Sequence, residues 1–261
     1  MKALAARRRH PLTAVVLLML ALVVTGGLYA LLAPQPAEAS TTTASADDIA
    51  AGEKLFLANC ATCHGLNAAG TQAAPSLIGV GAASVDFQVG TGRMPAQANG
   101  PQVLVRDVQY TEDEIAQLAA YVASLGAGPA IPTQEQLDAS DDITLGGELF
   151  RVNCAMCHNV VGAGGALTEG KFAPSLSGVS PEHVYEAMLT GPQSMPVFND
   201  ANITPDEKSA IIAYLQNLEE SGTAGGLSLG SLGPVSEGLF AWVFGIGALI
   251  ACAVWLGAKA S

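Results

Sequence analysis

The residues with the clearest chemistry lie in one pentapeptide that occurs twice, CATCH at residues 60–64 and CAMCH at residues 154–158. Two cysteines separated by two residues and followed by histidine are the attachment signature of c-type haem. The thiols can form thioethers with the porphyrin, and the histidine is held where it can ligate the iron. We therefore predict two covalently bound haem c groups. The attachment residues are Cys60, Cys63, Cys154 and Cys157, and the proximal iron ligands are His64 and His158.

Other uses of paired cysteines are also open to this sequence. A Cys-x-x-Cys pair can be a dithiol redox site, a disulfide or half of a zinc site. A shared zinc site would have to join Cys63 to Cys154, which is far from the usual zinc-ribbon spacing. A dithiol would not need a histidine after each second cysteine. Haem attachment is therefore the favoured interpretation.

The sixth ligand decides whether a haem iron carries electrons or binds small molecules. In the first half of the chain, Met94 is the only methionine between Met19 and Met156. It lies in Gly-Arg-Met-Pro after a glycine-rich turn, which argues against a core methionine in a regular helix. Met94 is the predicted distal ligand of the first iron.

The second half offers several distal ligands. Met195 shares a preceding Thr-Gly and a following proline with Met94. Met188 and His183 lie in a helical pattern that makes Met188 a core residue and His183 a surface residue. Met156 lies inside the haem motif and is poorly placed for the opposite face of the iron. Met195 is therefore the predicted ligand, and His/Met ligation would leave no open coordination position.

The two motifs belong to an internal repeat. Glycine, leucine, phenylalanine and asparagine recur at the same offsets before each first cysteine, at 52–60 and 146–154. Ala-Pro-Ser-Leu follows each motif, and its Pro75 or Pro174 carbonyl is a candidate acceptor for the histidine's other ring nitrogen. Each copy ends in an amphipathic helix that begins with a capping box, Thr-x-x-Glu at 111–114 and 204–207. An insertion at 96–110 could be a short strand or a docking loop.

Two apolar segments flank the repeat. Residues 12–33 are long enough to cross a bilayer, and so is the stretch 239–257 with its tryptophans. Arginines at 7–9 and Lys259 place both ends in the cytoplasm and the repeat outside. Ala-Glu-Ala at 37–39 also resembles a signal-peptidase site, so the first segment is either a retained anchor, which its length favours, or a cleaved signal.

The region between the apolar segments is acidic. From residue 40 to residue 235, six lysines and arginines oppose 21 aspartates and glutamates. Such a surface repels phosphate backbones, so we do not expect a nucleic-acid partner. It would suit a protein partner with a basic docking patch, and it equally serves as ordinary solubilising charge.

The repeat resembles class I cytochrome c domains. In that fold the first and last helices cross beside the haem, with a glycine and aromatic residues at the crossing. Gly52, Phe56 and Tyr121 match these roles in the first copy. The fold class implied is mostly α, with two tandem cytochrome c domains flanked by N- and C-terminal transmembrane helices. The corresponding residues of the second copy are Gly146, Phe150 and Tyr214.

The resulting organisation has nine parts. They are a cytoplasmic basic N-terminus (1–11), a transmembrane helix or signal peptide (12–33), a linker (34–46), cytochrome c domain 1 (47–126), a linker (127–140), cytochrome c domain 2 (141–220), a Gly/Ser-rich linker (221–238), a transmembrane helix (239–257) and a cytoplasmic tail (258–261).

In this order of parts the whole chain resembles the dihaem cytochrome c subunit of the actinobacterial menaquinol–cytochrome c reductase, the cytochrome bcc complex. The resemblance implies a multi-pass cell-membrane protein with its haem domains on the outer face. It implies a cytochrome b subunit, a Rieske iron–sulfur subunit and the copper-bearing subunit of an aa3-type cytochrome c oxidase as partners. Electrons would enter at the first haem and leave from the second, and quinol chemistry would belong to the other subunits.

Two other families remain alternatives. A dihaem subunit of a cbb3-type oxidase has a similar anchor and tandem domains, but would not be expected to have the C-terminal membrane helix. A dihaem peroxidase would be an enzyme with an open iron site, which a methionine ligand in each domain argues against. The sequence shows no general base, nucleophile or substrate pocket of its own.

Overall fold

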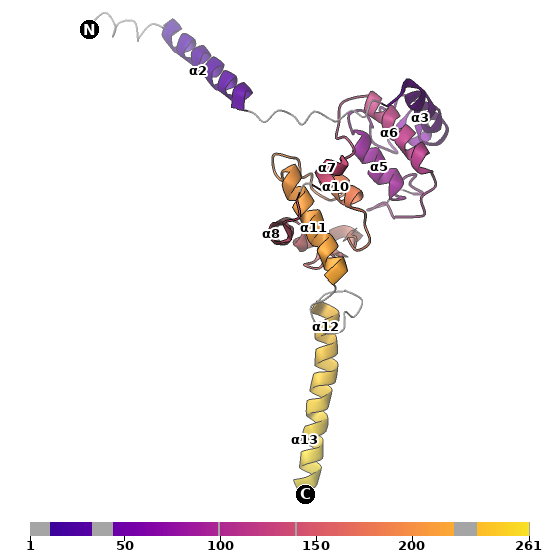
Figure 1. Cartoon of the computed structure of the whole chain (residues 1–261), viewed down its shortest axis with the longest axis vertical. Helices are drawn as coiled ribbons and strands as arrows, with labels where there is room; N and C mark the ends of the chain where they lie inside the picture. Colours follow the sequence, from indigo (N-terminus) through magenta and orange to yellow (C-terminus); the bar gives the residue numbers. More distant parts are fainter. Residues whose placement is uncertain (1–10, 33–43, 99, 139, 222–233, 261) are drawn as a thin grey trace, which may run out of the picture. The chain divides into compact units, whose positions relative to one another are not determined.

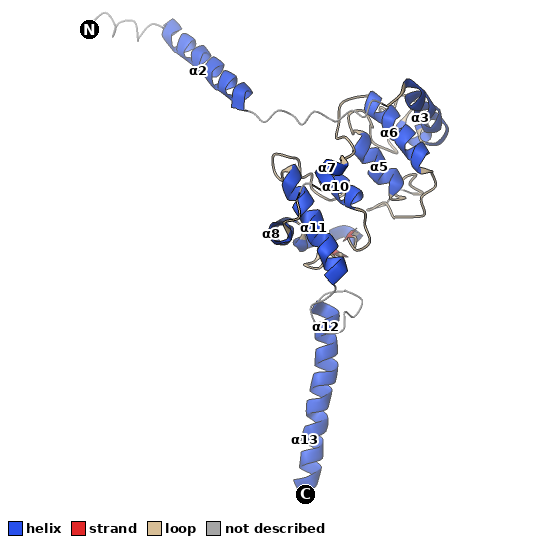
Figure 2. Cartoon of the chain, viewed as in Figure 1, coloured by secondary structure: helices blue, strands red, loops and turns tan. Residues whose placement is uncertain are grey.

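A computed structural model describes residues 11–32, 44–98, 100–138, 140–221 and 234–260. Helices make up most of its regular structure (Figure 2). The chain divides into two compact units, Met1–Glu38 and Ala39–Ser261. The predicted basic N-terminus, the possible cleavage sequence at 37–39 and most of the two outer linkers lie outside the described residues.

The second unit contains two helical domains with the same order of elements (Figure 1). The first domain contains α3 (Ala46–Asn59), α4 (Ala61–His64), α5 (Ala82–Gly90) and α6 (Glu112–Ser124). The short helix α7 (Gln134–Leu137) follows. The second domain contains α8 (Ile143–Asn153), α9 (Ala155–His158), β1 (Gly165–Ala166), the 3-10 turn η1 (Thr168–Gly170), β2 (Phe172–Ala173), α10 (Pro181–Thr190) and α11 (Pro205–Ser221). The two strands pair antiparallel.

Side-chain caps fix where the last helix of each domain begins. The Thr111 hydroxyl accepts from the backbone N–H of Glu114, whose carboxylate accepts from the backbone N–H of Thr111 in return. Thr204 and Glu207 form the same reciprocal pair. Both predicted capping boxes are confirmed. Each satisfies N–H groups that a helix start leaves without partners.

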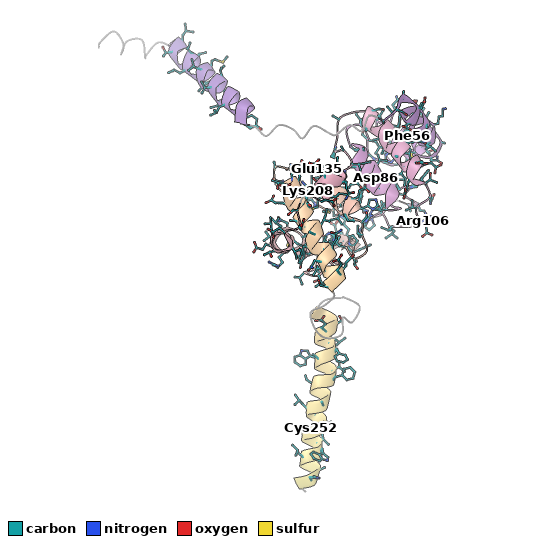
Figure 3. All side chains as sticks on the ribbon, viewed as in Figure 1. Phe56, Asp86, Arg106, Glu135, Lys208 and Cys252 are labelled. Atoms are coloured by element: carbon teal, nitrogen blue, oxygen red, sulfur yellow. The ribbon has the colours of Figure 1, made fainter. Side chains whose placement is uncertain are left out.

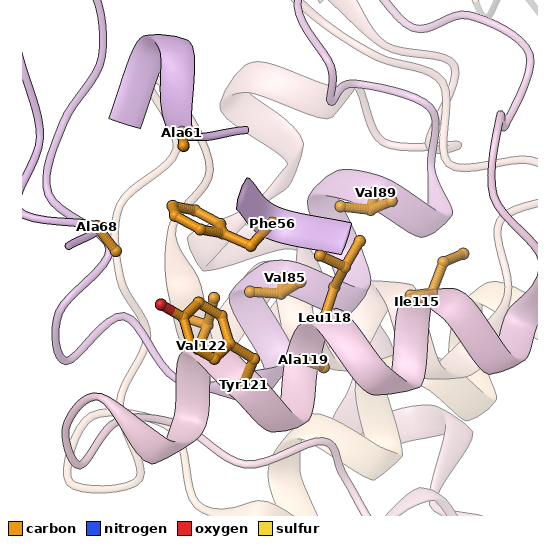
Figure 4. Packing of buried hydrophobic residues seen from close by; sticks show 10 residues of the cluster. All are labelled: Phe56, Ala61, Ala68, Val85, Val89, Ile115, Leu118, Ala119, Tyr121 and Val122. Atoms are coloured by element: carbon orange, nitrogen blue, oxygen red, sulfur yellow. The ribbon is translucent and has the colours of Figure 1, made fainter. Parts of the chain in front are cut away.

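In the first domain, α3 crosses α6 at a glycine. A Cβ atom added at Gly52 would lie 1.9 Å from the carbonyl oxygen of Gln117, so only glycine allows the two backbones to approach this closely. One turn further along, the rings of Phe56 and Tyr121 lie 5.3 Å apart. Figure 4 shows these two rings within the buried cluster that also contains Leu118. This crossing holds the start and the end of the domain together.

The second domain repeats this crossing between α8 and α11. A Cβ atom at Gly146 would lie 1.9 Å from the carbonyl oxygen of Ala210. The rings of Phe150 and Tyr214 lie 5.5 Å apart. The roles implied by the resemblance therefore correspond to contacts in both domains.

One buried charge in the second domain was not evident from the sequence. Lys208 on α11 is fully buried, and its ammonium donates to Asp200 and to the carbonyl of Ile203, both at 2.6 Å. It also lies 5.7 Å from the centre of the Tyr185 ring. A buried lysine needs such partners because an unpaired charge is costly away from water.

The insertion at 96–110 contacts the second domain. The Gln102 side chain donates to and accepts from the backbone of Phe172, at 2.9 and 2.8 Å. The Gln193 side chain makes the same two-way pairing with the backbone of Val103, at 2.9 and 3.1 Å. Residues 100–110 contain no strand. Of the two expectations for the insertion, the docking loop fits the described residues.

Helices α5 and α10 also pack against each other between the domains. His183 lies in this contact, 3.6 Å from Asp86, rather than on the open surface that its sequence position suggested. Glu186 is fully buried in the same contact. Burial, together with the nearby carboxyl groups of Asp86 and Glu182, raises the pKa of Glu186 to about 10.

The C-terminal segment is helical from α12 (Pro234–Phe240) through the π-helical η3 (Ala241–Ile246) to α13 (Gly247–Ala260). Within it, Ser236–Lys259 has a mean hydropathy of 2.3 and is long and apolar enough to cross a membrane. Figure 3 shows its side chains, with Cys252 labelled, around this helix. In the first unit, α2 (Pro11–Leu32) contains a shorter apolar stretch, Val15–Tyr29.

Replacing Gly52 with alanine should destabilise the first domain. The new methyl group would overlap a backbone carbonyl of α6, which cannot move away as a flexible side chain could. We expect a loss of about 3 kcal/mol, the upper part of the usual cost of overpacking. Thermal unfolding followed by circular dichroism measures it. Lys54→Ala on the same helix, at an exposed position, is the matched control, and equal unfolding temperatures for the two variants would contradict this account.

The buried carboxyl of Glu186 should make stability depend on pH. The folded protein holds its proton up to a pKa of about 10, whereas the unfolded chain releases it near 4.5. Folding thus binds a proton between these values, so this contribution to the free energy of unfolding falls as the pH rises, by up to about 1.4 kcal/mol per pH unit. Unfolding temperatures measured at about pH 5.5 and about pH 8.5 test this, and the contribution of Glu186 should be larger at the lower pH. A chelator in the buffer keeps metal ions from binding the carboxylates. Glu186→Gln should flatten the dependence, whereas the exposed Glu148→Gln should not.

Candidate haem-binding sites

Each cysteine motif forms a short helix that turns directly out of the helix before it. The Cys60 N–H donates to the Phe56 carbonyl at the end of α3, and the His64 N–H donates to the Cys60 carbonyl at 3.0 Å. Cys154 and His158 make the equivalent bonds after α8. Phenylalanine at the helix crossing therefore fixes the first turn of the motif. Both histidines are buried, and none of the motif cysteines forms a disulfide.

A proline carbonyl orients each histidine. His64 Nδ1 lies 2.8 Å from the carbonyl oxygen of Pro75, and His158 Nδ1 lies 3.0 Å from that of Pro174. A carbonyl can only accept, so Nδ1 carries the proton in each ring and Nε2 keeps its lone pair. This is the tautomer that a metal ligand needs, and the predicted acceptors are confirmed.

The second domain contains a cavity of about 560 Å³, a size typical of cavities that bind small molecules and cofactors. Both motif cysteines, His158 and Met195 line it. The remaining wall is largely apolar, with Phe198 and Leu215 among its residues. The predicted attachment and ligand residues of the second site therefore meet at one cavity, and they fit a covalently attached haem c.

The methionines occupy different environments. Met94 packs against the buried cluster of the first domain, which also contacts Cys60. Met195 lines the second cavity. Met188 is 2% exposed and Met156 is 91% exposed, and both also border the cavity. Met94 and Met195 thus stay the predicted distal ligands, and Met156 points to solvent.

The electrostatics of the second site disfavour a thiolate. Burial and the neighbouring Cys157 raise the pKa of Cys154 to about 11. Reactive dithiols and zinc ligands need a lowered thiol pKa instead, whereas a thioether sulfur carries no charge. Burial also lowers the pKa of His158, opposed by its bond to Pro174, so the ring stays neutral. No group of potential metal ligands among the described residues joins the two cysteine pairs.

The first domain contributes to the wall of the second cavity, which the sequence did not reveal. The contributing side chains come from α5, from the segment before Met94 and from the insertion. Arg93, directly before Met94, is one of them, and it lies 4.7 Å from the centre of the Phe87 ring. These residues are Phe87, Thr91, Arg93, Gln102 and Val105.

Known proteins with similar sequences identify the family. Residues 49–126 match the family cytochrome c, and residues 141–215 match the family cytochrome c oxidase, cbb3-type, subunit III. The cytochrome bc1 complex cytochrome c subunit of Corynebacterium efficiens is 47% identical over 85% of this chain and 81% of its own length. This chain belongs to the family of cytochrome bc1 complex cytochrome c subunits. The subunit of Mycobacterium tuberculosis is 42% identical over 97% of this chain and 93% of its own length.

Membership of the cytochrome bc1 complex cytochrome c subunits confirms the family named from the sequence. It implies covalently bound haem c and electron transfer in the respiratory chain. Of the relatives named for cbb3-type oxidases, the subunit CcoP of Rubrivivax gelatinosus is 27% identical over 75% of this chain and 62% of its own length. The bc1 relatives therefore match better in both identity and coverage. The helix Ser236–Lys259 is consistent with association with a membrane.

Removing one cysteine pair should remove one haem. With Cys154 and Cys157 both replaced by serine, we expect the covalent haem per chain, measured as the pyridine haemochrome after acid–acetone extraction, to fall by roughly half. Cys252→Ser, which changes the exposed cysteine outside both motifs, is the control and should keep the full amount. An unchanged haem content in the double variant would exclude attachment at this motif.

Proposed function

We propose that the chain is a dihaem electron-transfer subunit with one haem c in each domain. Cys60 and Cys63 would form the thioethers in the first domain, and His64 and Met94 would ligate the iron. The supporting observation is the doubled arrangement of a motif helix, a buried histidine and a proline carbonyl that sets its tautomer. The corresponding residues of the second domain are Cys154, Cys157, His158 and Met195.

When bound, the haem iron supplies one-electron redox chemistry, and the chain tunes and positions it. A methionine ligand beside the histidine would favour the ferrous state and would leave no open coordination position for peroxide. The apolar wall of the second cavity limits access of water, which also shifts the potential. These features support electron transfer rather than a peroxidase reaction.

We propose that electrons enter at the first domain and leave from the second. The donor would be the Rieske iron–sulfur protein of a menaquinol-oxidising complex that also contains cytochrome b. The acceptor would be the copper-bearing subunit of an aa3-type cytochrome c oxidase. The similarity to bc1 complex subunits over nearly the whole chain supports this route. The first-domain residues in the wall of the second cavity support direct transfer within the chain.

The membrane arrangement is part of the same proposal. Ser236–Lys259 would anchor the C-terminus, and residues 12–33 would be a second anchor or a cleaved signal. Both ends would then lie in the cytoplasm, with the haem domains on the outer face. The acidic balance of the intervening region is compatible with docking to basic surfaces of the neighbouring subunits.

The match of residues 141–215 to the cbb3-type family favours a subunit of a cbb3-type oxidase as the second candidate. Gentle purification with bound partners separates the two. Our proposal predicts co-purification with cytochrome b and Rieske subunits, and haem reduction by a menaquinol analogue that a quinol-site inhibitor blocks. Co-purification with a cbb3-type oxidase alone would overturn the proposal.

The methionine ligands can be tested by substitution. Met94→His or Met195→His should lower the reduction potential of that site alone, because imidazole favours the ferrous state less than a thioether does. The shift should fall within the range of about 0.8 V over which axial ligands tune haem. A spectroelectrochemical titration that resolves the two sites measures it. Met156→His, at an exposed position, is the matched control, and an unshifted potential would remove the altered methionine from the ligand set.

A further inference from the structure

The contact between α5 and α10 brings together three groups that can bind a cation. They are the carboxylates of Asp86 and Glu186 and the imidazole of His183, and one ligand atom from each lies within 4.8 Å of the other two. His183 Nε2 is 3.6 Å from Asp86 Oδ2. Asp86, labelled in Figure 3, comes from the first domain, whereas the other two residues come from the second.

The environment of Glu186 distinguishes this cluster from an ordinary group of acidic residues. Its side chain is fully buried, and neither carboxylate oxygen accepts a hydrogen bond from any donor among the described residues. A buried polar group without a partner is costly, and a buried charge is more so. One of its oxygens nevertheless lies close to ligand atoms of His183 and Asp86, where a bound cation would pair with it.

The surroundings of the cluster favour a cation. Glu182 adds negative charge close to Asp86 and Glu186, and Glu112 lies near Glu182, whereas Arg93 packs on the Phe87 ring beside His183. His183 and Glu186 are three residues apart on α10, so they project from one face of the helix toward α5. The edge of the Phe87 ring lies against His183, with centroids 6.1 Å apart and planes at 87°, which restrains the imidazole.

Gly90 leaves space beside Nε2 of His183. Gly90, the last residue of α5, faces the imidazole, and a Cβ atom there would lie 3.1 Å from His183 Nε2 and 3.9 Å from Asp86 Oδ2. The first distance is tighter than ordinary contact. An alanine at this position would therefore press on the two atoms that a cation would use.

We propose that Asp86, His183 and Glu186 form a zinc-type site for a divalent cation that joins the two haem domains. One imidazole and two carboxylates are donors that Zn²⁺ accepts, with water completing four-coordination. Calcium and magnesium prefer oxygen-only sets, which makes them poorer occupants. The bound ion would tie α5 to α10 and so close the long chain segment between Asp86 and His183. His183 also lines the second cavity, so the cation site adjoins the second haem site, but it uses none of the predicted haem ligands and does not depend on the route of electrons.

Zinc content provides the first test. The untagged full-length chain in detergent is stripped with a chelator, equilibrated with Zn²⁺ alone, desalted and analysed for zinc against haem iron by mass spectrometry. We expect one zinc per chain. Asp86→Asn, His183→Gln and Glu186→Gln should each weaken Zn²⁺ binding. Loss of a group that only hydrogen-bonds a metal ligand already costs roughly 10- to 100-fold in metal affinity, so loss of a ligand should cost at least that much.

Two further variants make the test specific. Glu182→Gln removes an adjacent negative charge on the same helix but no proposed ligand, so it should retain one zinc. Gly90→Ala keeps all three ligands and should lower zinc uptake through its methyl group. In each case the haem absorbance spectrum reports whether the chain is folded, and Zn²⁺ should raise the unfolding temperature only where it binds.

Three results would overturn the proposal. The first is no zinc uptake by the stripped chain, in which case the two carboxyl groups share a proton instead. The second is equal uptake by the parent chain and the ligand variants. The third is an equal loss in Glu182→Gln, which would assign binding to the acidic surface in general.

Discussion

The close crossing of the first and last helices is the constraint on which each domain depends. It exists because a glycine presents bare backbone to a carbonyl oxygen, at Gly52 in one domain and Gly146 in the other. The phenylalanine one turn later packs in the crossing and also accepts the hydrogen bond that starts the cysteine motif. A change at the crossing therefore moves the histidine, although the histidine belongs to another helix.

Features set within a few residues could be read from the sequence. The capping boxes at Thr111 and Thr204 and the proline carbonyls that face the two motif histidines were predicted from local sequence, and the repeat contains each of them twice. Even the core position of Met188 followed from helical periodicity. Agreement between two copies made these predictions firmer than one motif could.

Features that need two distant segments could not be read in this way. His183 was expected at the surface because its helix looked amphipathic by itself, and only packing on α5 gives it Asp86 as a neighbour. No pattern in the sequence singles out Lys208, yet Asp200 and a carbonyl hold it in the core. In the sequence, Arg93 is distinguished only as the residue before a predicted ligand. Its place at the second cavity depends on how the domains meet.

The two glutamine pairings between the domains have a consequence for how the relay responds to its medium. Gln102 and Gln193 each close a two-way bridge to a backbone, and neither bridge contains a formal charge. Dissolved salt screens interactions between charges, so it weakens hydrogen bonds between uncharged amide groups much less. A freely diffusing cytochrome must find its partner by electrostatic attraction, at a rate that falls with ionic strength. If each domain holds a haem as proposed, the second carrier is already in place, and these uncharged bridges would make transfer within the chain less dependent on salt than the encounter with a separate cytochrome.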